Sequence, residues 1–156
     1  MKRDLNKLRE ALLDLNGVLN RPQPDAALIA AAGVNLERAL FPLLTRVAMR
    51  GPLAIGELAE LSGRDYSTVS RQVGKLEELG LVSRRAQADD ARVTSVAITK
   101  KGEEMTAALD RAREKIMSSF LADWSKDEVA ELARLLRKLA DEALEFVRTE
   151  KSRPRS

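Results

Sequence analysis

The segment from Tyr66 to Leu79 carries the side chains best suited to contact another molecule. On a helical wheel at about 100° per residue, its apolar residues share one arc and its hydroxyl and cationic residues share the opposite arc. The inward arc holds Tyr66, Val69, Val73 and Leu76, and the outward arc holds Ser67, Arg71, Lys75 and Glu78, with Thr68 and Ser70 flanking it on either side. Arginine can donate two hydrogen bonds to guanine, and serine or threonine can contact bases or phosphates. The pattern favours a helix that enters the major groove of DNA, although an ordinary solvated helix face would have a similar composition.

Further cations lie beside this segment. Arg84, Arg85 and Arg92 follow it, and Arg64 precedes it. An arginine at the tip of a hairpin can enter the narrow minor groove, where the negative potential is enhanced. Arg92 lies near the tip of the predicted hairpin, and Asp90 could hold its side chain in position. The alternative is a charged turn that stays solvated. The candidate DNA-binding residues are Arg64, Ser67, Thr68, Ser70, Arg71, Lys75, Arg84, Asp90 and Arg92.

Other kinds of chemistry have little support in the 156 residues. There is no cysteine, so disulfides, thiolate nucleophiles and thiolate metal sites are excluded. There is no histidine, which removes the usual general base and the commonest transition-metal ligand. Catalysis would depend on carboxylates and lysine alone. We therefore expect no enzyme activity, no cofactor and no metal. The net charge of +3 permits a nucleic-acid partner without requiring one.

A helix-turn-helix can position the outward face of this segment. A short helix is predicted over 55–61, and Ser62, Gly63 and Arg64 form a tight turn. Asp65 is a suitable N-cap for the second helix, and Gly80 suits the position after its end, where a left-handed conformation is often required. Gly74 is also outward; it costs about 1 kcal/mol of helix propensity relative to alanine, and would help if a phosphate backbone comes close.

A β-hairpin is predicted directly after the second helix, in the position of a wing. Leu81–Ser83 reads as a short strand, 84–91 as a polar loop, and Val93–Ile98 as a strand rich in β-branched residues. Before the helix-turn-helix, Asn35 is the expected N-cap of a helix whose stripe is Leu36, Leu40, Leu43 and Val47. Pro42 falls inside this pattern and should kink the helix or mark a local irregularity.

The two ends of the chain carry stripes with a near-heptad period. The first is a predicted helix over 5–19 that ends before Pro22 and Pro24. A helix over 101–122 follows the hairpin, with Met105, Leu109, Ala112, Ile116 and Phe120 inward. Ser125 and Glu128 form a capping box for a last helix that runs to about Val147, followed by a frayed basic tail. The stripes form either an intramolecular core or a dimer interface, whose residues would be Leu5, Leu8, Leu12, Leu15, Leu132, Leu136, Leu139 and Phe146.

The predicted fold class is therefore mainly α, with a small β-hairpin wing. We expect an N-terminal dimerisation helix and linker over 1–35, a winged helix-turn-helix domain over 36–100, and C-terminal dimerisation helices with a basic tail over 101–156. No apolar run approaches the roughly 18 residues of a membrane span, and no apolar signal core follows the charged first residues. A cytoplasmic location without membrane contact is the corresponding expectation.

The central segments resemble the MarR family of transcriptional regulators. The resemblance lies in GPLAIGELAE from Gly51, YSTVSRQV from Tyr66 and KLEELGLV from Lys75. The wing adds Asp90 and Arg92, followed by Ile98, Thr99 and Gly102. The terminal helices are compatible with the family but are less specific.

This resemblance implies a triangular homodimer built from the first and the last two helices. It implies binding to palindromic operators in double-stranded DNA, usually as a repressor. Ser67, Thr68, Ser70 and Arg71 would meet the major groove, and Arg92, oriented by Asp90, the minor groove. Many members release DNA when a small phenolic or anionic ligand binds between the dimerisation and DNA-binding parts. The candidate pocket residues here, chosen for apolar character, are Leu40, Leu43, Leu44 and Trp124.

Two departures narrow the signals to which such a regulator could respond. Peroxide-sensing members need a reactive cysteine and metal-sensing members need histidine, and this chain has neither. Two other function classes stay open at this point. One is a dimeric winged-helix module that binds a partner protein and has no specific DNA binding. The other is an enzyme that uses carboxylates alone, for which the sequence offers no motif.

Overall fold

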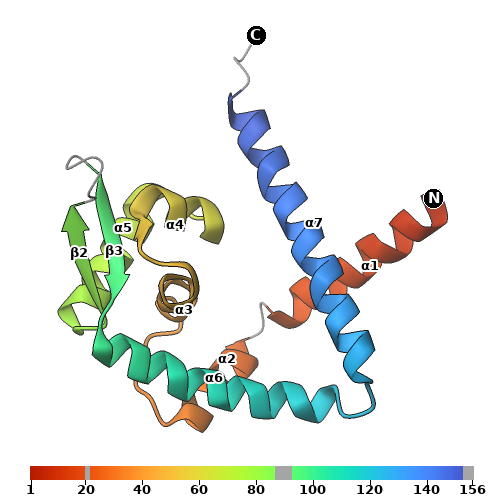
Figure 1. Cartoon of the computed structure of the whole chain (residues 1–156), viewed down its shortest axis with the longest axis horizontal. Coiled ribbons are helices and arrows are strands. Elements are labelled where there is room, and N and C mark those ends of the chain that lie inside the picture. Colours follow the sequence, from red (N-terminus) through yellow and green to blue (C-terminus); the bar gives the residue numbers. More distant parts are fainter. Residues whose placement is uncertain (20–21, 87–92, 153–156) are drawn as a thin grey trace. The chain divides into compact units, whose positions relative to one another are not determined.

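A computed structural model describes residues 1–19, 22–86 and 93–152 of the chain (Figure 1). Contacts within the chain divide it into two compact units, Met1–Ile116 and Met117–Ser156. The first unit contains the helix-turn-helix and a small sheet, and the second contains one long helix and the last residues of the helix before it. Among the described residues, no helix is both long enough and apolar enough to span a membrane.

The helix-turn-helix is present as the sequence predicts. Helix α4 covers Ile55–Ser62, and helix α5 covers Tyr66–Glu78. Gly63 between them has φ 63°, and Gly80 after α5 has φ 72°, so both glycines take the left-handed conformation that side chains disfavour. Asp65 is the N-cap of α5, as expected: its side chain accepts a hydrogen bond from the backbone N–H of Thr68 at 2.8 Å.

The wing is part of a three-stranded antiparallel sheet. Strands β2 (Val82–Ala86) and β3 (Thr94–Ile98) form the expected hairpin, with Val82 opposite Ile98 and Ala86 opposite Thr94 (Figure 1). Strand β1 (Leu53–Ala54) pairs with the other edge of β3. Strand β1 was not predicted, because two residues carry no periodicity. The predicted first strand, Leu81–Ser83, is too short: Arg84 and Arg85 lie on β2 rather than in a loop.

The region before the helix-turn-helix differs from expectation. Helix α1 covers Lys2–Leu19, but a helix α2 over Pro22–Ala32 was not predicted. Proline is tolerated in the first turn of a helix because its missing N–H would have no intrahelical partner there. For the same reason, the kink predicted at Pro42 is wrong. Helix α3 is Phe41–Arg50 with Leu40 as its N-cap, so Pro42 lies in the first turn and no kink is needed. Asn35 is therefore not the cap.

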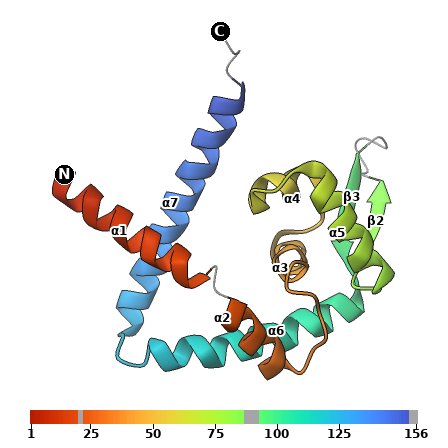
Figure 2. The ribbon, with the colours of Figure 1, turned by 180° about the vertical axis from the view of Figure 1, so that it is seen from behind.

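The core of the first unit packs α3, α4, α5 and the sheet against the first half of α6 (Lys100–Phe120). Figure 2 shows α5 on the near side of the β2–β3 hairpin and α6 beginning where β3 ends. To this core the predicted stripes contribute Leu43 and Val47 of α3, Val69, Val73 and Leu76 of α5, and Leu36 and Leu40, which lie before α3. Leu109 and Ala112 of α6 also join it, whereas Ile116 and Phe120, expected inward, are 38% and 63% exposed in the single chain.

The second unit consists mainly of helix α7, Lys126–Ser152. Its capping box is as predicted: Glu128 accepts from the backbone N–H of Ser125 at 2.8 Å, and the Ser125 hydroxyl accepts from the N–H of Glu128 at 3.2 Å. The helix continues past Val147, so residues 148–152 are helical and not a frayed tail. An ion pair between Arg148 and Glu145, at 3.9 Å, lies at the start of this extension.

Candidate nucleic-acid interface

Helix α5 is fixed by its buried face and its N-cap. Val69, Val73 and Leu76 have no exposed surface, which confirms the predicted inward arc at these positions. Tyr66 was expected on the same arc, but it is 60% exposed because the first residue of the helix lies beyond the core. The opposite face, with Ser67, Arg71 and Lys75, is open to solvent. The fold therefore presents a polar and cationic helix face on a rigid support.

The two hydroxyls at the start of α5 are held by the N-cap carboxylate. Ser67 Oγ donates to Asp65 Oδ1 at 2.6 Å, and Thr68 Oγ1 donates to Asp65 Oδ2 at 2.7 Å. These two hydrogen bonds, with the one from the Thr68 N–H, hold the pKa of Asp65 well below its ordinary value. Asp65 thus stays ionised and keeps both hydroxyls in one orientation.

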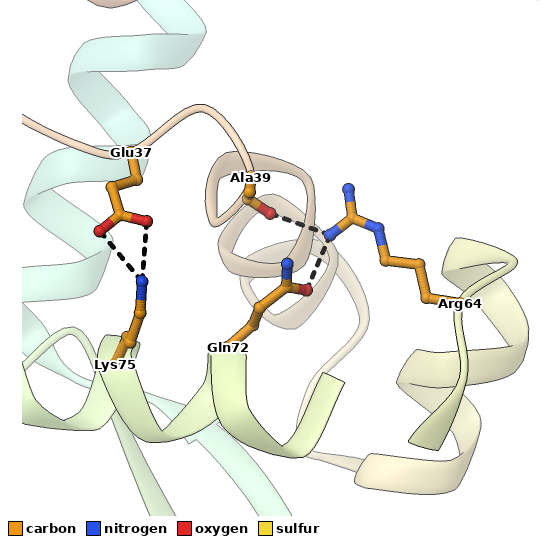
Figure 3. Close-up of polar contacts among 5 residues, drawn as sticks. All are labelled: Glu37, Ala39, Arg64, Gln72 and Lys75. Atoms are coloured by element: carbon orange, nitrogen blue, oxygen red, sulfur yellow. Dashed lines mark hydrogen bonds and ion pairs between the residues drawn. The ribbon is translucent and has the colours of Figure 1, made fainter. Parts of the chain in front are cut away.

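The cations of this face differ in their partners. Arg71 is exposed and forms no ion pair or hydrogen bond within the residues that the structure describes. Lys75 Nζ lies 3.1 and 3.2 Å from the two carboxylate oxygens of Glu37, in the segment between α2 and α3. Nη1 of the Arg64 guanidinium donates to both the Ala39 carbonyl and Gln72 Oε1, each at 2.9 Å (Figure 3).

These contacts tie the segment before α3 to helix α5 at two points, as Figure 3 shows. Neither Glu37 nor Gln72 was singled out from the sequence. Glu37 is 38 residues from Lys75, and Gln72 is 8 residues from Arg64, so no helical spacing relates either pair. A shallow hollow of about 250 Å³ lies on this face, lined by Thr68, Arg71, Gln72 and Lys75.

Arg84 of the hairpin lies against α5. Its guanidinium donates to the Ser70 carbonyl at 3.0 Å, and its Nε is 3.3 Å from a carboxylate oxygen of Glu77. A Cβ placed on Gly74 would stand 3.7 Å from the Arg84 guanidinium, an ordinary contact distance. Arg84 therefore braces the wing on the helix. Asp90 and Arg92 lie outside the described residues.

The remaining candidate residues are distributed over both units. Leu40, Leu43 and Leu44 are fully buried in the core of the first unit, whereas Trp124 belongs to the second unit and is 45% exposed. A ligand that reached the three leucines would have to displace core side chains. Their assignment to a pocket stays a prediction. In the described part of the chain, no cluster of three or more acidic side chains is placed to hold a metal ion.

The residues predicted for a dimer interface are mostly exposed in the single chain. On α1 these are Leu5, Leu8, Leu12 and Leu15; on α7 they are Leu132, Leu136 and Phe146. Leu139 is half-buried. Apolar stripes of this length are unfavourable in water.

Comparison with known proteins identifies the fold and the family. A family model described as HVO_A0114 matches residues 36–97. The chain is 35% identical to the uncharacterized HTH-type transcriptional regulator YxaD of Bacillus subtilis over 105 residues, which are 67% of this chain and 73% of that protein.

Solved structures agree with this match. A MarR family protein from Bacillus stearothermophilus, 24% identical, has the same fold with a TM-score of 0.71 over 92% of this chain and 97% of its own. The structure of MarR, 25% identical, superposes with a TM-score of 0.69 over 90% and 93% of the two chains. These proteins are transcriptional regulators rather than enzymes. The chain belongs to the MarR family of winged helix-turn-helix transcriptional regulators.

Proposed function

We propose that this regulator is a homodimeric repressor that binds a palindromic operator through α5. The observation that supports this most directly is Arg71, which is exposed at the middle of the hydroxyl-rich face and has no partner among the described residues. An arginine held out in this way is free to donate two hydrogen bonds to a guanine in the major groove. Members of the family bind DNA and act as dimers, which supports the same assignment.

The other candidate residues take supporting roles in this proposal. Ser67, Thr68 and Ser70 lie along the major groove beside Arg71, and Lys75 extends the cationic face by one turn. Arg64 and Arg84 flank the helix and contact the DNA backbone. Arg92, with Asp90, enters the minor groove from the tip of the wing. Phosphate contacts of this kind fix the register of the helix, and base contacts select the sequence.

Equilibrium binding tests the proposal. The duplex upstream of the protein's own gene and a scrambled duplex of the same composition are each titrated across a salt series. Arg71→Ala should weaken binding to the native duplex by about 1–3 kcal/mol and leave the scrambled duplex nearly unaffected, because a base contact is lost. Arg111→Ala, an exposed arginine of α6, is the matched control for net charge.

Each outcome of this titration assigns a different role. An equal loss on both duplexes would reassign Arg71 to a phosphate. Weak wild-type binding that is equal on both duplexes and disappears as salt rises would contradict an operator in this region. Capture of a protein partner without salt-sensitive DNA binding would favour an interaction module instead.

The exposed stripes of α1 and α7 support the dimer. A two-fold dimer places two recognition helices on successive major grooves, about one helical turn apart, and so requires a palindromic site. An operator with one half-site scrambled should therefore bind much more weakly than the intact site. Equal affinity for both duplexes would contradict the proposed symmetry.

For control of the repressor, we propose release from DNA by a small organic ligand, because the chain has no thiol or histidine with which to sense peroxide or metal. Aromatic carboxylates and phenols can be screened by the shift they cause in melting temperature. A ligand that raises the melting temperature of the free protein and weakens operator binding supports this control. If every ligand that binds leaves operator affinity unchanged, control by release is wrong.

A further inference from the structure

Helix α3 carries two arginines that are not among the residues proposed above to contact DNA. Arg46 and Arg50 are four residues apart on α3, a spacing that places their side chains on the same face. The Nε of Arg46 is buried and has no hydrogen-bond partner among the residues that the structure describes. Within the described residues, neither Arg46 nor Arg50 forms an ion pair with a carboxylate. This is an unusual environment for a buried guanidinium N–H.

A third arginine, Arg64, is close enough to Arg46 for their positive charges to interact. Burial lowers the pKa of Arg46, and the positive charges of Arg50 and Arg64 lower it further. Like charges four residues apart destabilise a helix, and a polar atom buried without a partner adds to that cost. Other arginines of the first unit are compensated where they pack against the chain: Arg113, also half-buried, has a carboxylate oxygen of Asp110 at 2.9 Å. No contact within the described residues offsets the repulsion among these three cations, whereas an anion bound beside their guanidinium groups would offset it.

The cluster is continuous with the helix face proposed for DNA. Arg64 donates to Gln72 Oε1 of α5 at 2.9 Å, and Gln72 lines the same hollow as Arg71 and Lys75. An anion bound by Arg64 would therefore lie beside the face of α5 that is proposed to enter the major groove. This continuity favours a phosphate of the bound DNA over a separate small anion.

We propose that Arg46, Arg50 and Arg64 bind a phosphate group of the DNA backbone that flanks the major groove occupied by α5. The proposal rests on the DNA-binding function proposed above. Guanidinium groups suit this role because their N–H groups match the phosphate oxygens in pairs and remain charged at all relevant pH values. The contact carries no sequence information; it fixes the position of α3, and with it α5, on the duplex.

The experiment compares wild type with Arg46→Gln, Arg50→Gln and the control Arg111→Gln, which makes the same change in net charge. Each protein is titrated with the native and the scrambled duplex across a salt series, and its melting temperature is measured. Arg46→Gln and Arg50→Gln should each bind about tenfold more weakly at low salt, by the same factor on both duplexes. The slope of log affinity against log salt should become shallower by about 0.9 for each, and Arg111→Gln should match wild type.

Arg50 is exposed, so its variant tests the site even if Arg46→Gln folds poorly. We expect neither variant to lower the melting temperature, because each relieves repulsion between like charges. Unchanged salt slopes in two folded variants would overturn the inference and leave the DNA-binding function intact. A loss confined to the native duplex would overturn it in favour of base recognition.

Inorganic phosphate separates the two sources of the anion. If it raises the melting temperature of wild type but not of Arg46→Gln, while DNA affinity is unchanged in the variant, the site takes a small anion and the backbone contact is wrong. If wild type itself shows no salt-sensitive affinity for either duplex, the proposed function fails first, and this inference fails with it.

Discussion

The ion pair between Lys75 and Glu37 sets up a competition that can be measured. Both side chains are more than half exposed, at 54% and 62%, and the pair is formed in the free protein. A phosphate that binds Lys75 must either displace the Glu37 carboxylate or share the ammonium group with it. We therefore predict that Glu37→Gln strengthens DNA binding, although it removes an ion pair from the folded protein.

The magnitude follows from the geometry. Glu37 oxygens lie 3.1 and 3.2 Å from Nζ, so a phosphate on the same ammonium would stand about 5 Å from the carboxylate. Two like charges at that distance repel by about 0.8 kcal/mol in bulk water, and an exposed ion pair itself contributes about 0–1 kcal/mol. Glu37→Gln should therefore improve affinity by about 1 kcal/mol, or roughly fivefold, and change folding stability by less than that.

Fluorescence anisotropy with the operator duplex across a salt series provides the assay. The salt slope should steepen by up to about 0.9, because Lys75 then neutralises a phosphate without an internal competitor. Glu104→Gln, an exposed carboxylate of α6, makes the same change in net charge and should have little effect. An equal gain in both variants would mean that net charge alone is responsible. Weaker binding by Glu37→Gln would refute the competition and show that Glu37 holds Lys75 in place for DNA.

Four further predictions concern folding and assembly. Gly74→Ala should stabilise the protein by up to about 1 kcal/mol in urea unfolding, because a Cβ has space beside Arg84; a loss of DNA affinity in the same variant would indicate close approach of a phosphate. Gly102→Ala should destabilise by about 1–3 kcal/mol or more, since its Cβ would overlap the Leu81 carbonyl and crowd Ile98. Unchanged stability would mean that the turn before α6 can shift freely. Asp65→Ala should lower the melting temperature at neutral pH. Because the pKa of Asp65 is depressed below its ordinary 3.8, its contribution is present above that value and is lost as pH falls, so the difference from wild type should shrink between about pH 5 and pH 2. A constant difference would mean that the ionised carboxylate is not the source. Leu136→Glu on α7 should convert the proposed dimer to monomer in sedimentation equilibrium, and a variant that stays dimeric would place the interface elsewhere.

Periodicity predicted the elements that bury one face, and local chemistry predicted their ends. The inward arc of α5 and the caps at Asp65 and Ser125 follow from spacing and from side-chain types alone. Helix α2 was missed because alanine forms its surface all round and leaves no amphipathic stripe. Pro42 was misread because the sequence does not say whether a proline lies in a first turn or in the middle of a helix.

The partners of the candidate site residues could not be predicted in the same way. The pairs Lys75–Glu37 and Arg64–Gln72 form only when the chain folds the segment before α3 against α5. The Arg46 environment is also invisible in sequence, because burial of one N–H depends on packing around α3. The sequence pattern therefore located the cationic face. Only the tertiary structure shows that Arg71 has no partner among the described residues, whereas Arg64, Lys75 and Arg84 have partners.

The N-cap of α5 also decides which kind of hydrogen bond its first turn can offer. Ser67 and Thr68 each have one hydroxyl proton, and both protons are donated to Asp65. What remains toward solvent is the lone pairs, so the first turn presents acceptors. Phosphate oxygens have nothing to donate, whereas the amino groups of adenine and cytosine in the major groove do. The same carboxylate that begins the helix thus sets the polarity of its first turn in favour of base edges that carry an amino group.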